Sequence, residues 1–381
     1  MHPFRFEPYD LPAEAHTLRA DVRAFLREKL SGMAAADRAR TWMGFDPAFS
    51  QAVGGRGWIG MTWPKAYGGH EKGAWERYVV MEEMLAAGAP VAAHWFADRQ
   101  SGPLLLKFGT EEQRRRFLPG IARGETYFCI GMSEPGAGSD LAAVKTRARR
   151  LAGGWSVSGQ KIWTSNAQGC QYMIALVRTG TDENKHAGLS QLVIDLNSSG
   201  ITIRPIADLT GGAHFNEVFF DSVVVPDSML IGAEGQGWQQ VTAELAFERS
   251  GPERYLSSLQ LLIAFVRSVG DSPTESEQVF VGRCMAELWT LRQMSLSIAG
   301  QLAEGTAPAT EAAIVKDLGT AFEQKLPRAI QALGRDDVDP NGKGALNEVL
   351  AYLLQISPAF SLRGGAREIL RGMIARELGL R

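Results

Sequence analysis

The chain has 381 residues, of which 45% are hydrophobic and 22% are charged, and its formal net charge is −2. This length allows two or three domains with a substantial buried core, because domains usually hold ~100–200 residues. The near-neutral charge gives no electrostatic footprint for nucleic acid, so a polyanionic partner is not expected.

The three cysteines are Cys129, Cys170 and Cys284. They are too few and too scattered for a disulfide framework or a zinc cluster, so no metal site is expected. The N-terminal residues lack the basic-then-apolar order of a secretory signal, and no window reaches ~18 uninterrupted apolar residues. The sequence therefore predicts a cytoplasmic protein that does not associate with membranes.

Three regions with different sequence patterns follow one another along the chain. Helical periodicity fills residues 13–121, short β-branched and aromatic runs separated by glycines fill 126–225, and helical spacing returns from Gly237. We therefore predict an α+β fold with an N-terminal helical domain, a middle β domain built as a small barrel or sandwich, and a C-terminal helical bundle. The expected domains are residues 1–122, 123–233 and 234–381, and the expected C-terminal helices lie near 239–267, 275–304, 308–333, 343–357 and 365–379.

The densest chemical signal is the string Ser133-Glu-Pro-Gly-Ala-Gly-Ser-Asp140, which follows a strand-like apolar run. Gly136 and Gly138 remove side chains where a large group must approach the backbone. The amides and the hydroxyls of Ser133 and Ser139 can donate to phosphate or flavin oxygens. Most glycine-rich turns only reverse the chain, but this eight-residue string is much more specific.

A second string, Gly159-Gln-Lys-Ile-Trp-Thr-Ser-Asn166, follows about twenty residues later. A lone tryptophan in a strand is by default a core aromatic. Trp163, however, is followed at once by Thr164 and Ser165, so one strand offers a flat stacking surface beside hydrogen-bond donors. An isoalloxazine ring needs both.

With these motifs, and with Phe108-Gly-Thr-Glu-Glu-Gln113 and Leu118-Pro-Gly-Ile121, the sequence resembles the acyl-CoA dehydrogenase family over nearly its whole length. The resemblance implies FAD as cofactor, an acyl-CoA substrate whose β-hydride passes to flavin N5, and an electron-transfer acceptor. It implies that Met132 and Ser133 contact the pyrimidine side of the flavin and that Trp163 packs on the ring. The implied flavin-binding residues are Met132, Ser133, Gly138, Ser139, Trp163, Thr164 and Ser165, and the implied substrate-binding residues are Ser139 and Arg249.

The reaction also needs a base for the α-proton of the thioester. Many family members place a glutamate just before a glycine that leads into the last helix, and here that position is Gly364. Either the chain is inactive or its base lies elsewhere.

A second arrangement within the family puts the glutamate before an arginine on the first long helix of the C-terminal bundle, where this chain has Glu248 and Arg249. The spacing from Val241 and Leu245 places Glu248 on an apolar stripe, where burial would raise the pKa of its carboxyl group toward the range of a general base. Glu248 could instead pair with Arg249 or Arg254 at a bundle interface. Because Gly364 cannot serve, we favour Glu248 as the base.

Pro252 cannot donate to the Glu248 carbonyl, so a kink or break is expected there. Either the regular helix begins only after Pro252, or the helix bends there and widens the acyl pocket. The sequence does not distinguish these two possibilities.

The C-terminal half of the flavin site departs from the family. The Arg-x-x-Phe-Gly segment reads Arg267-Ser-Val-Gly-Asp-Ser272, and the glycine cluster after the glutamine segment has become Tyr352-Leu-Leu-Gln-Ile-Ser-Pro-Ala-Phe360. The pattern resembles the base-bearing subunit of two-gene acyl-CoA dehydrogenases, which often act on steroid side chains. It implies an α2β2 heterotetramer with a related subunit. A same-fold oxidase or monooxygenase, or a non-catalytic structural subunit, remain alternatives.

Overall fold

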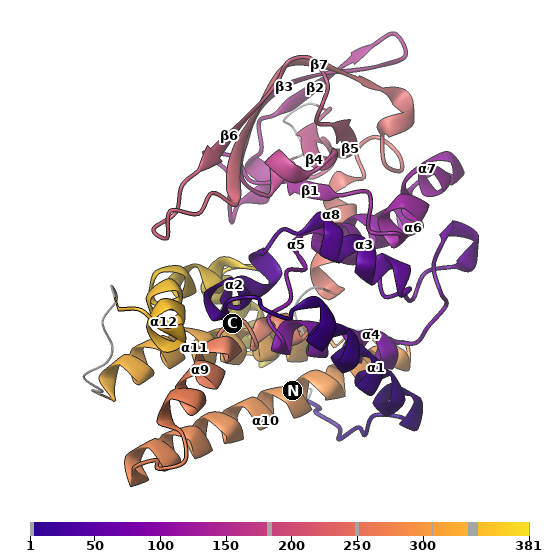
Figure 1. The fold of residues 1–381 in the computed structure, drawn as a ribbon. Coiled ribbons are helices and arrows are strands. Elements are labelled where there is room, and N and C mark those ends of the chain that lie inside the picture. The colour runs from indigo at the N-terminus through magenta and orange to yellow at the C-terminus, as the bar shows by residue number, and fades with distance from the viewer. Residues whose placement is uncertain (1–3, 181–184, 248–250, 307, 334–341, 381) are drawn as a thin grey trace. The chain divides into compact units, whose positions relative to one another are not determined.

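The structure is a computed structural model that describes residues 4–180, 185–247, 251–306, 308–333 and 342–380 (Figure 1). The expected base Glu248 and its neighbour Arg249 lie outside these ranges. The chain divides into two compact units, each built from several segments. We call them the helical unit (Met1–Gly44, Gly73–Pro90 and Ala246–Arg381) and the sheet unit (Phe45–Lys72 and Val91–Leu245). The two units interleave along the sequence and do not correspond one to one with the expected domains. The domains 1–122, 123–233 and 234–381 therefore stay a prediction.

The sheet unit is built on one mixed sheet, which the described residues form from seven strands in the order β1-β4-β2-β3-β7-β6, with β5 paired to β4. The long strands β3 and β7 pair antiparallel, whereas β1 and β4 are parallel. The strands are β1 (Phe128–Gly131), β2 (Arg147–Leu151), β3 (Gly154–Ser165), β4 (Tyr172–Arg178), β5 (Leu189–Asp195), β6 (Ile201–Ile206) and β7 (Phe215–Pro226).

Burial explains the strand sequences of this unit. β4 and β5 are buried along almost their whole length. β4 accordingly reads as a continuous apolar run up to Val177, whereas β5 also buries Ser190 and Gln191. β2 reads Arg147-Ala-Arg-Arg-Leu and is mostly exposed, and it is held by its antiparallel pairing with β3. The helices of the sheet unit are α3 (Pro47–Gly55), α5 (Ala92–Phe96), α6 (Gly102–Phe108), α7 (Glu111–Ala122) and most of α8 (Gly237–Phe247).

The helical unit contains α1 (Ala13–Lys29), α2 (Ala35–Arg40), α4 (Ala74–Ala86), α9 (Leu259–Val269), α10 (Glu275–Ala303), α11 (Ala309–Ala332), α12 (Ala345–Ile356) and α13 (Arg367–Glu377). Their ends follow local signals. Thr274 begins α10 with a capping box, in which its hydroxyl accepts from the Glu277 amide at 3.3 Å and Glu277 accepts from the Thr274 amide at 2.8 Å. The predicted order of helical, β and helical regions is confirmed.

The helix expected near 239–267 is divided in two. α8 ends at Phe247, residues Pro252–Arg254 form a 3-10 turn, and α9 begins at Leu259. Because proline has no N–H to donate, it is accommodated at the first position of the short turn and not inside a continuous helix. The predicted break is confirmed.

Charged side chains join three helices of the helical unit. Glu82 on α4 accepts from Arg19 of α1 at 2.8 Å and from Arg292 of α10 at 2.6 Å. Glu83 pairs with Arg23 at 2.7 Å. Because both carboxylates are buried, loss of one partner would leave a costly uncompensated charge. Among the described residues, no helix combines the length and apolar character needed to cross a membrane.

Candidate active site

The glycine-rich string forms a tight turn directly after β1. Glu134 and Ala137 exchange both backbone hydrogen bonds, at 2.8 and 3.0 Å. A β-carbon added at Gly136 or Gly138 would meet no described atom within 4 Å, and neither glycine has a positive φ. Neither the protein's packing nor its backbone conformation therefore requires glycine here. The bare backbone faces open space into which a ligand can fit.

Trp163 lies at an irregularity in β3. Lys161 pairs with Val218 of β7 and Thr164 pairs with Asn216, so two residues of β3 oppose one residue of β7. Such bulges re-aim side chains. Trp163 takes a φ of 59° and keeps 56% of its surface exposed, with its ring edge-on to Phe215 at 6.0 Å. It is not a core aromatic, and positive φ at a bulky residue is costly unless the surroundings impose it.

The two hydroxyls after Trp163 have different environments. Thr164 is 1% exposed, and its Oγ1 has no hydrogen-bond partner among the described residues. Ser165 is half-buried and pairs in register with Phe215. Trp163 and Ser165 are thus both accessible to a ligand, whereas Thr164 is buried between them. A buried hydroxyl without a partner costs free energy, so a ligand that supplies one would stabilise the site.

Lys161 and Glu134 belong to the same two strings, and the structure brings them together in a buried ion pair. The Lys161 ammonium is fully buried, lies 2.8 Å from Glu134 Oε1 and donates to the Met132 carbonyl at 3.0 Å. Glu134 also accepts from the amides of Lys145 and Thr146 at 2.6 and 2.9 Å. Burial lowers the pKa of Lys161 to about 8 against the opposing effect of Glu134. Burial would raise the pKa of Glu134, but Lys161 and its hydrogen bonds outweigh this and lower it.

The first turns of α8 pack against the glycine-rich turn. Val241 is 1% exposed and belongs to one apolar cluster with Ala137, and Met132 and Trp238 pack against the same cluster. The turn that carries the expected flavin contacts and the helix that ends at Phe247 therefore share a core. Glu248, the next residue, lies outside the described residues.

Gly364, where many family members have a glutamate, faces a buried cation. Gly364 has a φ of 64°, and a β-carbon there would lie 2.9 Å from Arg254 Nη2. Arg254 is 4% exposed. A side chain at this position would meet both backbone strain and a close contact.

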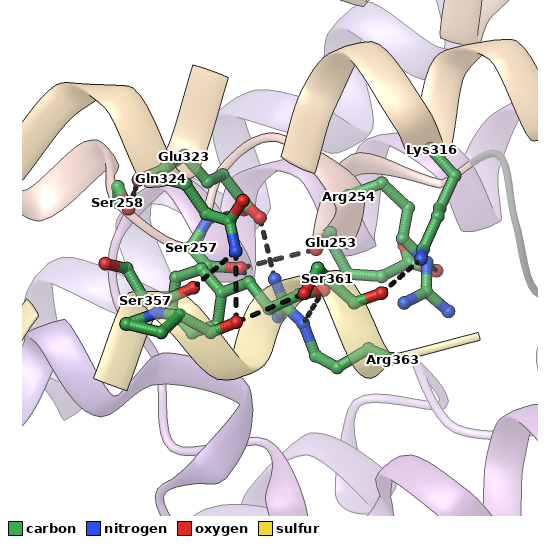
Figure 2. A network of polar contacts seen from close by, with 12 residues as sticks. Glu253, Arg254, Ser257, Ser258, Lys316, Glu323, Gln324, Ser357, Ser361 and Arg363 are labelled. Atoms are coloured by element: carbon green, nitrogen blue, oxygen red, sulfur yellow. Dashed lines mark hydrogen bonds and ion pairs between the residues drawn. The ribbon is translucent and has the colours of Figure 1, made fainter. Parts of the chain in front are cut away.

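A buried polar network surrounds this segment (Figure 2). Arg363 donates to Glu323 Oε2 at 2.7 Å and to Ser257 Oγ at 3.0 Å, and the Ser257 amide donates to Glu323 Oε1 at 2.7 Å. The Lys316 ammonium donates to the Ser361 carbonyl at 2.9 Å and to the Gly365 carbonyl. Burial raises the pKa of Glu323 and lowers the pKa of Arg363 to about 10. The network fixes the backbone on both sides of Gly364.

Arg267, from the segment that lacks the family's Phe-Gly, lies in the last turn of α9. It lines a cavity of about 500 Å³ in the helical unit, together with Arg38 and Lys343. Tyr352 belongs to α12, and a 3-10 turn over Ser357–Leu362 replaces the family's glycine cluster. Both segments are thus ordinary helical elements in this chain.

Comparison with known proteins places the chain in a family. The acyl-CoA dehydrogenase N-terminal domain model matches residues 12–125, and the middle domain model matches residues 129–223. The chain belongs to the acyl-CoA dehydrogenase family, and it is an oxidoreductase of that class. It is 34% identical to the acyl-CoA dehydrogenase IpdE1 of Mycobacterium tuberculosis, over 96% of this chain and 98% of that protein.

Two solved structures of heteromeric enzymes are similar throughout. The Tcur3481–Tcur3483 steroid ACAD is 29% identical, with a TM-score of 0.85 over 98% of this chain and 99% of that chain. The ChsE4–ChsE5 complex from Mycobacterium tuberculosis is 27% identical, with a TM-score of 0.84 over 98% of this chain and 100% of that chain.

The cofactor of the family is FAD, and the sheet unit has features that suit it. The open cradle at Gly136 and Gly138, the exposed ring of Trp163 and the unpartnered hydroxyl of Thr164 lie on the two strings that the sequence assigned to the flavin. They offer bare backbone, a stacking surface and a polar group, which are the contacts that a flavin nucleotide requires. The individual contacts with FAD stay predictions for all seven residues: Met132, Ser133, Gly138, Ser139, Trp163, Thr164 and Ser165.

Proposed function

We propose that this chain performs the α,β-dehydrogenation of an acyl-CoA thioester with Glu248 as the base that removes the α-proton. FAD, when bound, accepts the β-hydride. The carboxylate of Glu248 has to take the α-proton as that hydride leaves, because the proton of a thioester is only weakly acidic.

The observation that carries this proposal is the packing of α8 on the glycine-rich turn. Val241 shares a core with Ala137, so α8 is anchored to the predicted flavin-binding turn. Glu248 is the next residue in the sequence after Phe247, where the described part of α8 ends. Gly364 supports the same assignment, because a side chain there would contact buried Arg254.

Burial by substrate also favours Glu248. The sequence pattern predicts apolar surroundings for Glu248, and the exclusion of water by an acyl chain would favour its action as a general base. Arg249 and Ser139 are the proposed substrate-binding residues, since a cation and a hydroxyl can hold the polar parts of a CoA thioester.

The test is Glu248→Gln, which retains size and hydrogen-bonding shape. We expect FAD to remain bound while anaerobic flavin bleaching by substrate slows ~10²–10⁴-fold or more. Glu244→Gln makes the same chemical change one helical turn earlier and should bleach at the wild-type rate. Wild-type bleaching by Glu248→Gln would rule out Glu248 as the base.

We further propose a bulky acyl group such as a steroid side chain as the substrate. Support comes from the similarity to a protein described as a steroid ACAD at 29% identity over nearly the full length of both chains. A series of CoA thioesters from butyryl to steroid carboxylic acids tests it. We expect kcat/KM to rise toward the steroid thioesters, and a maximum at short linear chains would overturn this substrate class.

A further inference from the structure

The ion pair of Lys161 and Glu134 lies directly beneath the turn predicted to bind the flavin. It joins that turn to β3, because Glu134 is the second residue of the turn and Lys161 is a strand residue whose side chain is fully buried. Neither group faces solvent, so the pair is not a solvated surface contact of small consequence.

The contacts of this pair fix the backbone on the ligand side. The Lys161 ammonium holds the Met132 carbonyl at 3.0 Å, and the Ile162 amide donates to the Ser133 carbonyl at 2.9 Å. Two successive carbonyls are thus held against β3. Glu134 is fixed in turn by the amides of Lys145 and Thr146, on the far side of the turn.

We propose that Lys161 and Glu134 are positioning residues of the flavin site, which hold Met132 and the turn from Ser133 to Asp140 in the conformation that receives FAD. This inference rests on the assignment of FAD to the sheet unit. The pair acts through Met132 and the turn, and it touches no reacting atom itself.

The charge of the pair has a second consequence. The ammonium lies behind the Met132 carbonyl, so a ligand held against Met132 binds close to a buried cation whose field is weakly screened. A cation next to a bound flavin favours its electron-rich form. Loss of the charge should therefore make the flavin's reduction potential more negative, which a purely structural ion pair would not do.

Three variants of the full-length flavin-loaded protein, with any co-purifying subunit, test the proposal. Lys161→Met removes the donor to Met132. Glu134→Gln keeps an acceptor oxygen for only one of the two amides, because Lys145 donates to Oε2 and Thr146 donates to Oε1. Lys161→Met/Glu134→Gln removes both charges with little change in volume, so no buried charge is left uncompensated. Gln160→Met is the matched control, because Gln160 is the neighbouring strand residue and its amide donates instead to Glu217 at 3.0 Å.

We expect Lys161→Met and the double variant to bind FAD at least tenfold more weakly, with an altered flavin absorption spectrum and a more negative potential. Glu134→Gln should weaken FAD binding less and, because it leaves the ammonium unopposed, should shift the potential in the opposite, positive direction. Gln160→Met should match the wild type. If the double variant folds and retains wild-type FAD affinity, spectrum and potential, the pair is only structural and the inference fails. Failure of the wild-type protein to bind FAD would instead overturn the flavin assignment itself.

Discussion

Gly364 lies directly beside the Arg254 side chain: a β-carbon at Gly364 would lie 2.9 Å from the Arg254 guanidinium. Arg254 is 4% exposed and belongs to the same network as Glu253, Glu323 and Arg363 (Figure 2). In this chain the space where many relatives have a glutamate borders a buried cation. The absence of a base at Gly364 is therefore built into the surrounding side chains and is not a single-residue loss.

The first prediction is that position 364 does not accommodate a side chain. Gly364→Ala should destabilise the protein by ~1–2 kcal/mol for the left-handed backbone, and further for the contact with Arg254. Gly305→Ala is the matched control, because Gly305 has a φ of 83° but no atom within 4 Å of a β-carbon. The free energies of unfolding from denaturant titrations give the comparison. An equal loss of unfolding free energy in both variants would mean that the Arg254 side chain moves aside at little cost.

Gly364→Glu provides the functional counterpart. Added to Glu248→Gln, it should not restore dehydrogenation, because its side chain would have to displace buried Arg254. Anaerobic bleaching by substrate is the measurement. Recovery of even a tenth of the wild-type rate would show that the two positions are interchangeable.

A second prediction separates the two tryptophans of β3. Trp163 is 56% exposed and Trp155 is 1% exposed. Trp163→Ala should leave the free energy of unfolding nearly unchanged and weaken FAD binding about tenfold, since an aromatic pair contributes ~0.5–1.5 kcal/mol beyond its buried area. Trp155→Ala should cost ~3–5 kcal/mol of stability. A Trp163→Ala protein with normal FAD affinity would refute the stacking role.

The sequence predicted the order of helical and β regions and the C-terminal helices because their signals are local. Thr274 before Glu277 marks the start of α10, and Pro252 marks the break after α8. β2 and β6 were not predicted. The arginine-rich β2 lacks β-branched residues and owes its conformation to pairing with β3, which is a tertiary interaction that no local pattern contains.

The flavin contacts of the candidate site stay predictions, and the sequence indicated only part of the arrangement that the structure shows there. The strings around Ser133 and Trp163 were identified, because glycine spacing and adjacent hydroxyls are visible in a sequence. The exposure of Trp163 was not, since it depends on a bulge created by the register with β7. The pairing of Lys161 with Glu134 joins residues 27 positions apart, and only the sheet brings them together. Arg254 beside Gly364 is likewise a product of helix packing.

A third prediction concerns pH and His94. This ring is buried, and its Nδ1 lies 3.0 Å from Ser50 Oγ. Burial lowers the pKa of His94 from 6.5 to about 4, against a small opposing effect of Asp98. Between these values the unfolded chain binds a proton that the folded protein does not. Stability should therefore fall as pH drops from 6.5 to 4, by at most about 3 kcal/mol from this residue, and should not change on its account above 6.5.

Denaturant titrations from pH 4 to pH 7 measure this loss. His94→Gln should flatten the curve over that window, while His16→Gln, at an exposed position, should leave it unchanged. An identical slope in His94→Gln and the wild type would assign the acid sensitivity to other groups.

The last prediction is that the working particle is an α2β2 heterotetramer with a related acyl-CoA dehydrogenase subunit. FAD is long, and its diphosphate and adenine need donors beyond those of the sheet unit. The segments that would supply them lack the family's Phe-Gly and glycine cluster, and here they form the end of α9 and the Ser357–Leu362 turn. In a homotetramer, symmetry would repeat the same incomplete surface at every site. The similar ChsE4–ChsE5 structure is a complex of two proteins.

We therefore expect weak FAD retention when the chain is expressed alone, and two flavins per four chains when it is co-expressed with its partner. Native mass combined with the flavin-to-protein ratio measures both. A stable homotetramer with four flavins, active without a second polypeptide, would contradict the prediction. In that case Arg267 becomes the residue to examine, because it lines a cavity with two other cations, Arg38 and Lys343. Arg267→Met should then lower the flavin content of the homotetramer, whereas in the heterotetramer it should leave the flavin content unchanged.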